Sequence, residues 1–210
     1  MSCMSILSDL LIRAEHRIYI QKKRMRLQNK DICILSSNCN GAYILHDMGC
    51  RFNTPTVNLY FKPADFLKFI KNPVLYLNAE PVQVYEDGVD YPVGSLLDIK
   101  VYFMHYKSFD EAKNKWVQRS KRVSLNNVFV MMTDKDGCTY QQLLEFEQLP
   151  YKRKVVFTCR PYPELKSAFY IPGFEEQGEV GTLSDWKPQL WRRRWLDDYD
   201  YVSVINRNSR

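Results

Sequence analysis

The sequence predicts an α/β protein with three layers, in which helices cover both faces of a mainly parallel β-sheet. Short apolar runs alternate with helix-like stretches from Asp31 onward, and residues 36–49 read as a turn that joins a strand to a helix. A Rossmann-like topology is compatible with this alternation. With 210 residues, of which 45% are hydrophobic and 26% charged, the chain is large enough for one core.

An N-terminal basic amphipathic helix is expected within residues 1–30, ahead of a single α/β domain over 31–206. Apolar residues recur at helical spacing over 5–28 without an interrupting Pro or Gly. The basic residues of this stretch and its end are Arg13, Arg17, Lys22, Lys23, Arg24, Arg26 and Lys30. The helix over 5–28 is therefore expected either to lie on an anionic membrane surface or to pack on its own domain.

The remaining elements follow from local pattern. Strands are expected at 32–36, 56–60, 82–86, 98–103, 127–132 and 154–158. Helices are expected at 41–48, 63–72, 109–122, 139–149 and 163–171. Residues 86–98 are rich in turn formers and predict a loop, and the alternating YVSVI at 201–205 predicts a last strand at a sheet edge.

Composition restricts the classes of function. No apolar stretch is long enough to cross a bilayer and the first residues lack the pattern of a signal peptide, so a cytoplasmic location is expected. The six cysteines show no zinc-type spacing and are expected to be free thiols. A net charge of +6 favours an anionic partner. Nucleic acid is not expected, because no recognition helix, zinc finger or RNP-like strand is present.

Polar side chains follow four of the expected strands, at 36–40, 105–107, 133–136 and 158–160. Ligands of open parallel sheets bind outside the carboxyl ends of the strands, where these loops converge. Cys39 also lies where a strand ends and a helix begins, a position that favours anions and can lower the pKa of a thiol. This edge is therefore the predicted site.

Three kinds of chemistry fit these residues. In the first, Cys39 is a nucleophile and His105 its base, with Asp134 or Asp136 orienting the imidazole. His46 is the alternative base, although a helix beginning near residue 41 would carry it away from the site.

In the second, the SSNCNG turn binds a phosphate that basic side chains neutralise. The turn residues are Ser37, Asn38 and Asn40, and the candidate cations are Lys107, Arg160 and the arginines at 192–194. The glycine spacing of a dinucleotide or P-loop motif is absent.

In the third, Asp134 and Asp136 of TDKDG bind a divalent metal, Mg²⁺ or Mn²⁺, that bridges a diphosphate. The alternative is a plain turn in which Gly137 supplies the positive φ angle.

The sequence also resembles a known family. The segments that carry the resemblance are SSNCNGAYILHDMGCRFNTPTVNLYFKPADFLKFIKNP, YPVGSLLDIKVYFMHYKSFDEAKNKWVQR, NNVFVMMTDKDGCTYQQLLEFEQLPYKRKVVFTCRPY and KSAFYIPGF. Together they look like the bacterial domain of unknown function 1919 family, often labelled exopolysaccharide biosynthesis protein, from about Asp31 to Asn206. The family's turn often reads NNCxGG, whereas this chain has Ala42 in place of the second glycine.

The resemblance implies a genetic context of capsule, lipopolysaccharide or exopolysaccharide assembly. It offers no established catalytic residues that could be assigned to positions of this sequence. With the residues above, it leads us to expect a cytoplasmic enzyme, peripheral at the inner membrane face if the N-terminal helix binds lipid. Its substrate is expected to be a sugar on a nucleotide or lipid phosphate, such as a nucleotide sugar or sugar phosphate. The alternatives are a non-catalytic accessory protein that binds other assembly proteins, and a Cys39-dependent hydrolase or acyltransferase.

Overall fold

The computed structural model describes residues 3–188 and 193–207, with side chains from residue 12 onward. Its helices are α1 (Cys3–Arg26), α2 (Asn40–Met48), α3 (Pro63–Lys71), α4 (Pro73–Leu77), α5 (Phe109–Ser120), α6 (Tyr140–Glu147) and α7 (Tyr201–Asn206). Its strands are β1 (Cys33–Ser36), β2 (Val82–Val84), β3 (Val93–Leu96), β4 (Ile99–Tyr102), β5 (Val128–Thr133), β6 (Lys154–Thr158) and β7 (Ala168–Tyr170). Short 3₁₀ turns occupy 125–127, 175–177 and 195–198.

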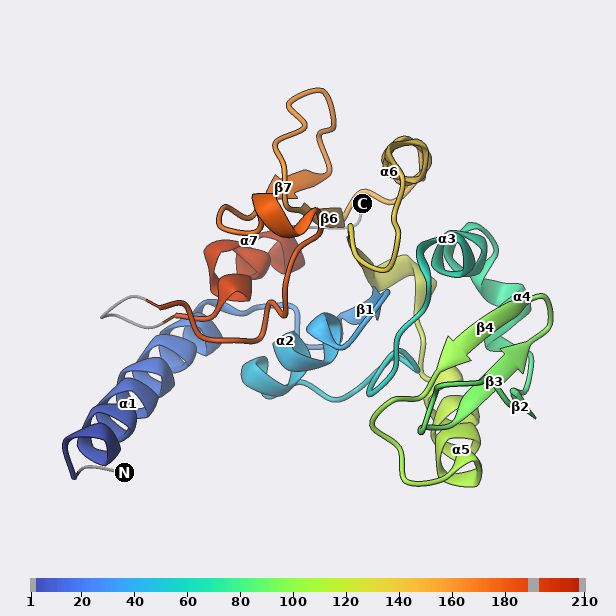
Figure 1. The fold of residues 1–210 in the computed structure, drawn as a ribbon, viewed down its shortest axis with the longest axis horizontal. Helices are drawn as coiled ribbons and strands as arrows, with labels where there is room; N and C mark the ends of the chain where they lie inside the picture. The colour runs from blue at the N-terminus through green and yellow to red at the C-terminus, as the bar shows by residue number, and fades with distance from the viewer. Residues whose placement is uncertain (1–2, 189–192, 208–210) are drawn as a thin grey trace.

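The main sheet is parallel, as predicted. Its four strands lie in the order β1-β5-β6-β7, and every neighbouring pair is parallel. The spatial order follows the order along the chain, so these strands lack the reversal that defines a Rossmann-type doubly wound sheet. Figure 1 shows this sheet between the blue and red helices on one side and the green and yellow elements on the other.

Alternation along the strands gives the sheet its two covered faces. One face of β1 and β5, including Leu35 and Val130, packs against α3, α5 and α6. The other face, including Ile34 and Phe129, packs against α1, α2 and α7. The three-layer α/β prediction is therefore confirmed, and both layers of helices are held by apolar burial.

A second, smaller sheet corrects part of the strand prediction. Strands β2, β3 and β4 form an antiparallel sheet of their own, so the runs expected at 82–86 and 98–103 do not enter the parallel sheet. The expected loop at 86–98 contains β3. The strand expected at 56–60 is not formed: residues 57 and 58 bend, Asn58 has a left-handed backbone (φ 63°), and a single bridge joins Tyr60 to Tyr102.

Two expected elements have the opposite secondary structure. Residues 163–171, expected as a helix, include β7, which pairs with β6 through Phe157 and Phe169. Residues 201–205, expected as an edge strand, form α7, whose first turn is capped by the Asp200 carboxylate accepting from the Ser203 amide at 3.3 Å. The prediction failed at 201–205 because burial at adjacent positions also fits a short helix packed on the sheet.

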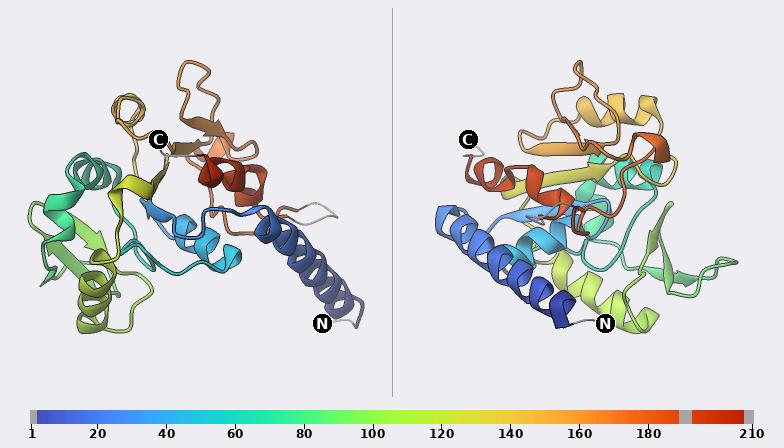
Figure 2. Two further views of the ribbon diagram at one scale, coloured as in Figure 1. Left: turned by 180° about the vertical axis from the view of Figure 1, so that it is seen from behind. Right: turned by 60° about the vertical axis from the view of Figure 1, so that its left-hand side comes forward.

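Helix α1 projects from the body of the molecule at its N-terminal end and packs on it at the other (Figures 1 and 2). Ile20 and Leu27 enter the apolar cluster under α2 and α7. Three of its basic residues make internal contacts: Lys23 approaches Asp197, Arg24 donates to the Asp47 carbonyl and Arg26 pairs with Asp200. No helix in the described part of the chain is long and apolar enough to cross a membrane.

Candidate functional site

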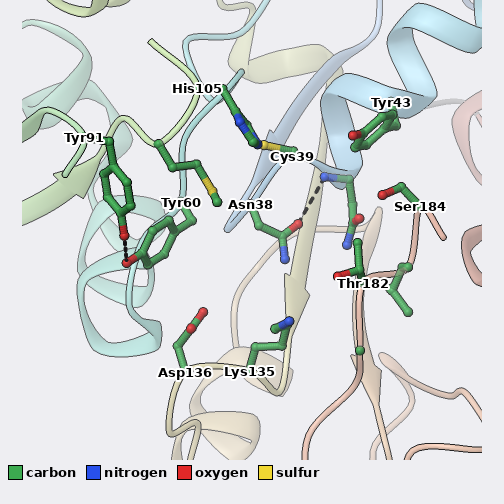
Figure 3. Close-up of a pocket in the computed structure, with 14 residues that line it drawn as sticks. Asn38, Cys39, Tyr43, Tyr60, Tyr91, His105, Lys135, Asp136, Thr182 and Ser184 are labelled. Atoms are coloured by element: carbon green, nitrogen blue, oxygen red, sulfur yellow. Dashed lines mark hydrogen bonds between the residues drawn. The ribbon is translucent and has the colours of Figure 1, made fainter. Parts of the chain in front are cut away.

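A cavity of about 340 Å³ opens at the carboxyl ends of β1 and β5 (Figure 3). The segment after β1 supplies Asn38, Cys39 and Asn40, and the segment after β5 supplies Lys135 and Asp136. The lining is completed by residues 181–184 and by the side chains of Tyr43, Tyr60, Tyr91, Met104 and His105. The sheet edge predicted from the sequence therefore borders a cavity, as the rule for parallel sheets requires.

The start of α2 is fixed by close packing and by one side-chain hydrogen bond. A Cβ atom on Gly41 would lie 2.8 Å from Cγ2 of Ile34, so only glycine lets the helix approach β1 this closely. The Asn38 Oδ1 atom accepts from the Asn40 amide at 3.1 Å, and Asn38 Nδ2 donates to Thr133 Oγ1 at 3.0 Å. Asn38 thus joins the β1 and β5 loops, and the first turn of α2 faces the cavity.

Cys39 and His105 lie together on one wall, and the imidazole points toward the thiol in Figure 3. The Cys39 thiol donates to the Leu59 carbonyl at 3.7 Å. Burial raises the pKa of Cys39 above its ordinary value, against the lowering effect of hydrogen bonds with backbone at Leu59 and Asn58. The lowering of the thiol pKa that the sequence allowed for is therefore not present, and Cys39 rests as a neutral thiol.

Lys135 and Asp136 form the facing wall. Asp136 has a left-handed backbone (φ 59°), and its amide donates to Glu179 at 2.9 Å. Exclusion of water by surrounding atoms and the nearby Glu179 charge raise the pKa of Asp136. The wall thus offers one cation and one carboxyl group to a ligand.

Three tyrosines lining the cavity were not identified from the sequence. The Tyr60 and Tyr91 hydroxyls are 2.9 Å apart, and Tyr43 comes from the first turn of α2. Tyrosine presents an apolar ring and a polar tip, which suits a ligand with both kinds of surface. Tyr60 and Tyr91 come from irregular segments and have no helical or strand periodicity, so no local signal marked them.

Asp134 has a structural position beside the cavity. It is buried; Oδ1 accepts from the Val180 amide at 2.8 Å and Oδ2 from the Cys159 amide at 2.6 Å. Each oxygen therefore accepts from a backbone amide, which gives Asp134 a structural role in joining β5 to the segments at 159 and 180. Among the residues whose side chains are described, no three His, Cys, Asp or Glu groups are arranged to hold a metal ion.

The other candidate residues lie apart from the cavity. Ser37 is buried and its backbone carbonyl accepts from Phe61. Lys107 lines a separate cavity of about 480 Å³, and Arg160 is exposed after β6. In the arginine run, Arg192 lies outside the described residues and Arg194 pairs with Asp47. The cation at the cavity is Lys135 instead.

The fold and site define an α/β protein with a tyrosine-lined cavity at the carboxyl edge of a parallel sheet. The model of the family described as a domain of unknown function (DUF1919) matches residues 12–206, and the chain belongs to that family. It is 43% identical over 197 residues to an uncharacterized protein of Haemophilus influenzae (strain ATCC 51907 / DSM 11121 / KW20 / Rd), covering 93% of this chain and 94% of that protein. The match begins inside α1, so the region matched by the family includes part of that helix.

Proposed function

We propose that the cavity binds a phosphorylated sugar and that the protein is an enzyme of surface polysaccharide biosynthesis. It would act in the cytoplasm on a sugar carried by a nucleotide or a lipid phosphate. The observation that carries the proposal is the placement of Lys135 and the first turn of α2 in one cavity with tyrosine rings. Backbone amides at a helix start and a lysine suit a phosphate, and tyrosines suit a sugar ring.

The two walls suggest a division of roles. Lys135 and the α2 start bind the phosphate, and Asn38 holds the two loops that carry them in register. His105, on the other wall, is within the cavity and is the candidate general base. The link to polysaccharide assembly comes from the sequence resemblance, and peripheral contact of α1 with anionic lipid belongs to the same proposal.

Lys135→Met is expected to weaken binding of a phosphorylated sugar by about ten- to a hundredfold, because a hydrogen bond to a charged group contributes about 1.5–3 kcal/mol. Thermal shift with nucleotide sugars and sugar phosphates measures this. A ligand at about a hundred times its dissociation constant adds roughly 2.7 kcal/mol to the free energy of unfolding, which is readily visible.

Lys107→Met is the matched control, because Lys107 is an exposed lysine that lines a different cavity. Its ligand shifts should equal those of the wild type. Equal shifts in Lys135→Met and the wild type would remove Lys135 from the site. If no phosphorylated sugar shifts the melting temperature of the wild type, the proposed function is replaced by the alternative hypothesis of an accessory protein, which binds assembly partners without catalysis.

The second candidate is a Cys39-dependent hydrolase or acyltransferase. The observation in its favour is that Cys39 and His105 border the same cavity. Against it, burial keeps the pKa of Cys39 raised, and the thiol donates to a backbone carbonyl instead of to the imidazole. A ligand that displaced the Leu59 contact would have to activate the thiol.

Alkylation of Cys39 by iodoacetamide is expected to be slow at pH 7 and to accelerate steadily as the pH rises, because only the thiolate reacts and burial raises the pKa of this thiol above its ordinary value. Peptide mass spectrometry follows the modification of each cysteine, and Cys39→Ser identifies the peptide. Rapid labelling at pH 7 that is lost in His105→Ala would instead establish an activated thiol and favour the second candidate.

A further inference from the structure

A second cavity, of about 300 Å³, borders the same wall as the first. Both cavities are lined by Cys39, Tyr43 and His105. The second is completed by groups that the first lacks, among them Arg119 and His46. The thiol and imidazole therefore belong to two binding spaces at once, and the second has no role in the function proposed above.

Within the described part of the chain, Arg119 forms no ion pair with a carboxylate at this cavity. Its Nη1 donates to the Tyr106 hydroxyl at 2.8 Å, and its guanidinium carbon lies 5.5 Å from the centre of the Phe52 ring. Both partners are uncharged, so these contacts orient the guanidinium without neutralising it. The Tyr106 hydroxyl also donates to the Val57 carbonyl at 3.0 Å, which fixes the tyrosine from the other side.

The rest of the lining defines the kind of ligand. His46, at the end of α2, has a side chain that is 78% exposed and stands at the cavity. Phe52, Val57 and Ala42 supply apolar surface beside the Arg119 charge. A planar guanidinium held in place recognises a carboxylate or phosphate with two parallel hydrogen bonds. The combination suits an oxyanion attached to a small apolar body.

We infer that this second cavity is a binding subsite for such an oxyanion, held by Arg119 with His46 at the rim. The inference deepens the proposed function and rests on it in one respect: the phosphorylated sugar occupies the first cavity, so the wall of Cys39 and His105 lies between two ligands. Two ligands bound on either side of one base suit the transfer of a group from one ligand to the other. Hydrolysis of a single substrate would not require the second binding site.

The three histidines of the chain provide a direct test. Of the two cavities, His46 lines the second alone and His105 lines both, whereas His16 lines neither and lies against Asp197 and Trp186. Their imidazole Cε1–H resonances can be followed by NMR in the full chain at fixed pH and ionic strength. Butyrate and monobutyl phosphate are the probes, because they share an apolar body and differ in the oxyanion.

The expected result is a saturable shift of the His46 and His105 resonances with at least one probe and no shift of His16. Arg119→Met should raise the dissociation constant of that probe about tenfold or more, from the loss of charge-assisted hydrogen bonds. The variant is expected to fold, because Tyr106 keeps its bond to Val57. Arg122→Met is the control: Arg122 donates to the Phe52 carbonyl at 3.4 Å but does not line the cavity.

Two outcomes would overturn the subsite: neither probe moves the His46 resonance, whether or not His105 shifts, or Arg119→Met binds the probe as tightly as the wild type does. Butyrate binding more tightly identifies an organic acid as the ligand chemistry, and monobutyl phosphate binding more tightly identifies a phosphoester. If the subsite is rejected, the proposed function is still supported when phosphorylated sugars shift the His105 resonance but not the His46 resonance. The converse result is that the probes shift the His46 resonance in an Arg119-dependent way while no phosphorylated sugar shifts any histidine resonance. That result would support the subsite and reject the proposed function.

Discussion

Asp197→Leu is expected to lower the free energy of unfolding by about 3–5 kcal/mol, because it removes a buried carboxylate that lies beside the side chains of Lys23, Arg194 and His16. The Asp197 side chain is fully buried. Its Oδ1 lies 3.6 Å from Lys23 Nζ, and its Oδ2 lies 3.3 Å from His16 Nε2 and 3.6 Å from Arg194 Nε. Loss of the carboxylate leaves Lys23, which is 4% exposed, with a charge it cannot solvate.

The pKa of Asp197 is consistent with this role. Burial acts to raise it, but the hydrogen bond with His16 and the charges of Arg194 and Lys23 outweigh burial and hold the pKa below its ordinary value. A carboxyl group with a lowered pKa stabilises the folded state above its unfolded pKa of about 3.9, and this contribution is lost as the pH falls through the folded pKa. The difference between wild type and variant should therefore shrink under acid conditions.

Urea denaturation followed by circular dichroism measures the change, with hydrogen exchange in α1 as a second readout. Asp198→Ala is the control, since that carboxylate is 30% exposed and pairs with Lys187 near the surface, where an ion pair contributes about 0–1 kcal/mol. If Asp197→Leu lowers the free energy of unfolding by less than about 1 kcal/mol, the contacts of Asp197 with Lys23, His16 and Arg194 do not hold α1 to the C-terminal segment.

The parts of the site that the sequence predicts are those with a local signal. The apolar run at 32–35 followed by SSNCNG predicts a strand and a helix start, and the structure has both, with Gly41 packed against Ile34. The rule for parallel sheets then brings the β5 loop, and with it Lys135, to the same edge. Local sequence pattern and one topological rule are therefore sufficient to predict the strand, the helix start and the position of the β5 loop.

The parts that could not be predicted depend on contacts distant in sequence. Tyr91 reaches the cavity from a turn-rich segment, and its position is set by the antiparallel sheet. Whether a basic residue such as Lys23 faces a membrane or a buried carboxylate depends on Asp197, which lies far along the chain. Periodicity is also ambiguous over five residues, which is why YVSVI at 201–205 reads as a strand and forms α7.

Asp134 shows the same ambiguity in the site itself, and its replacement is the second large effect expected. In TDKDG the two aspartates are equivalent as sequence, yet only Asp134 is buried, accepting from the Cys159 and Val180 amides. Asp134→Asn should cost about 2–4 kcal/mol: one amide loses a charge-assisted hydrogen bond, and the new NH₂ group meets an N–H donor. Asp136→Asn is the matched control and should change stability by less than about 0.5 kcal/mol, because Asp136 is exposed at the cavity.

The measurement also separates a structural aspartate from a metal ligand. If Asp134 only joins β5 to the segments at 159 and 180, the loss in Asp134→Asn is the same in EDTA and in excess Mg²⁺ or Mn²⁺. A metal ligand would instead make the wild type more stable with added metal and the variant insensitive to it. Because Val180 directly precedes the cavity residues 181–184, a structural role further predicts that Asp134→Asn weakens phosphorylated-sugar binding by loosening that wall, although Asp134 does not line the cavity.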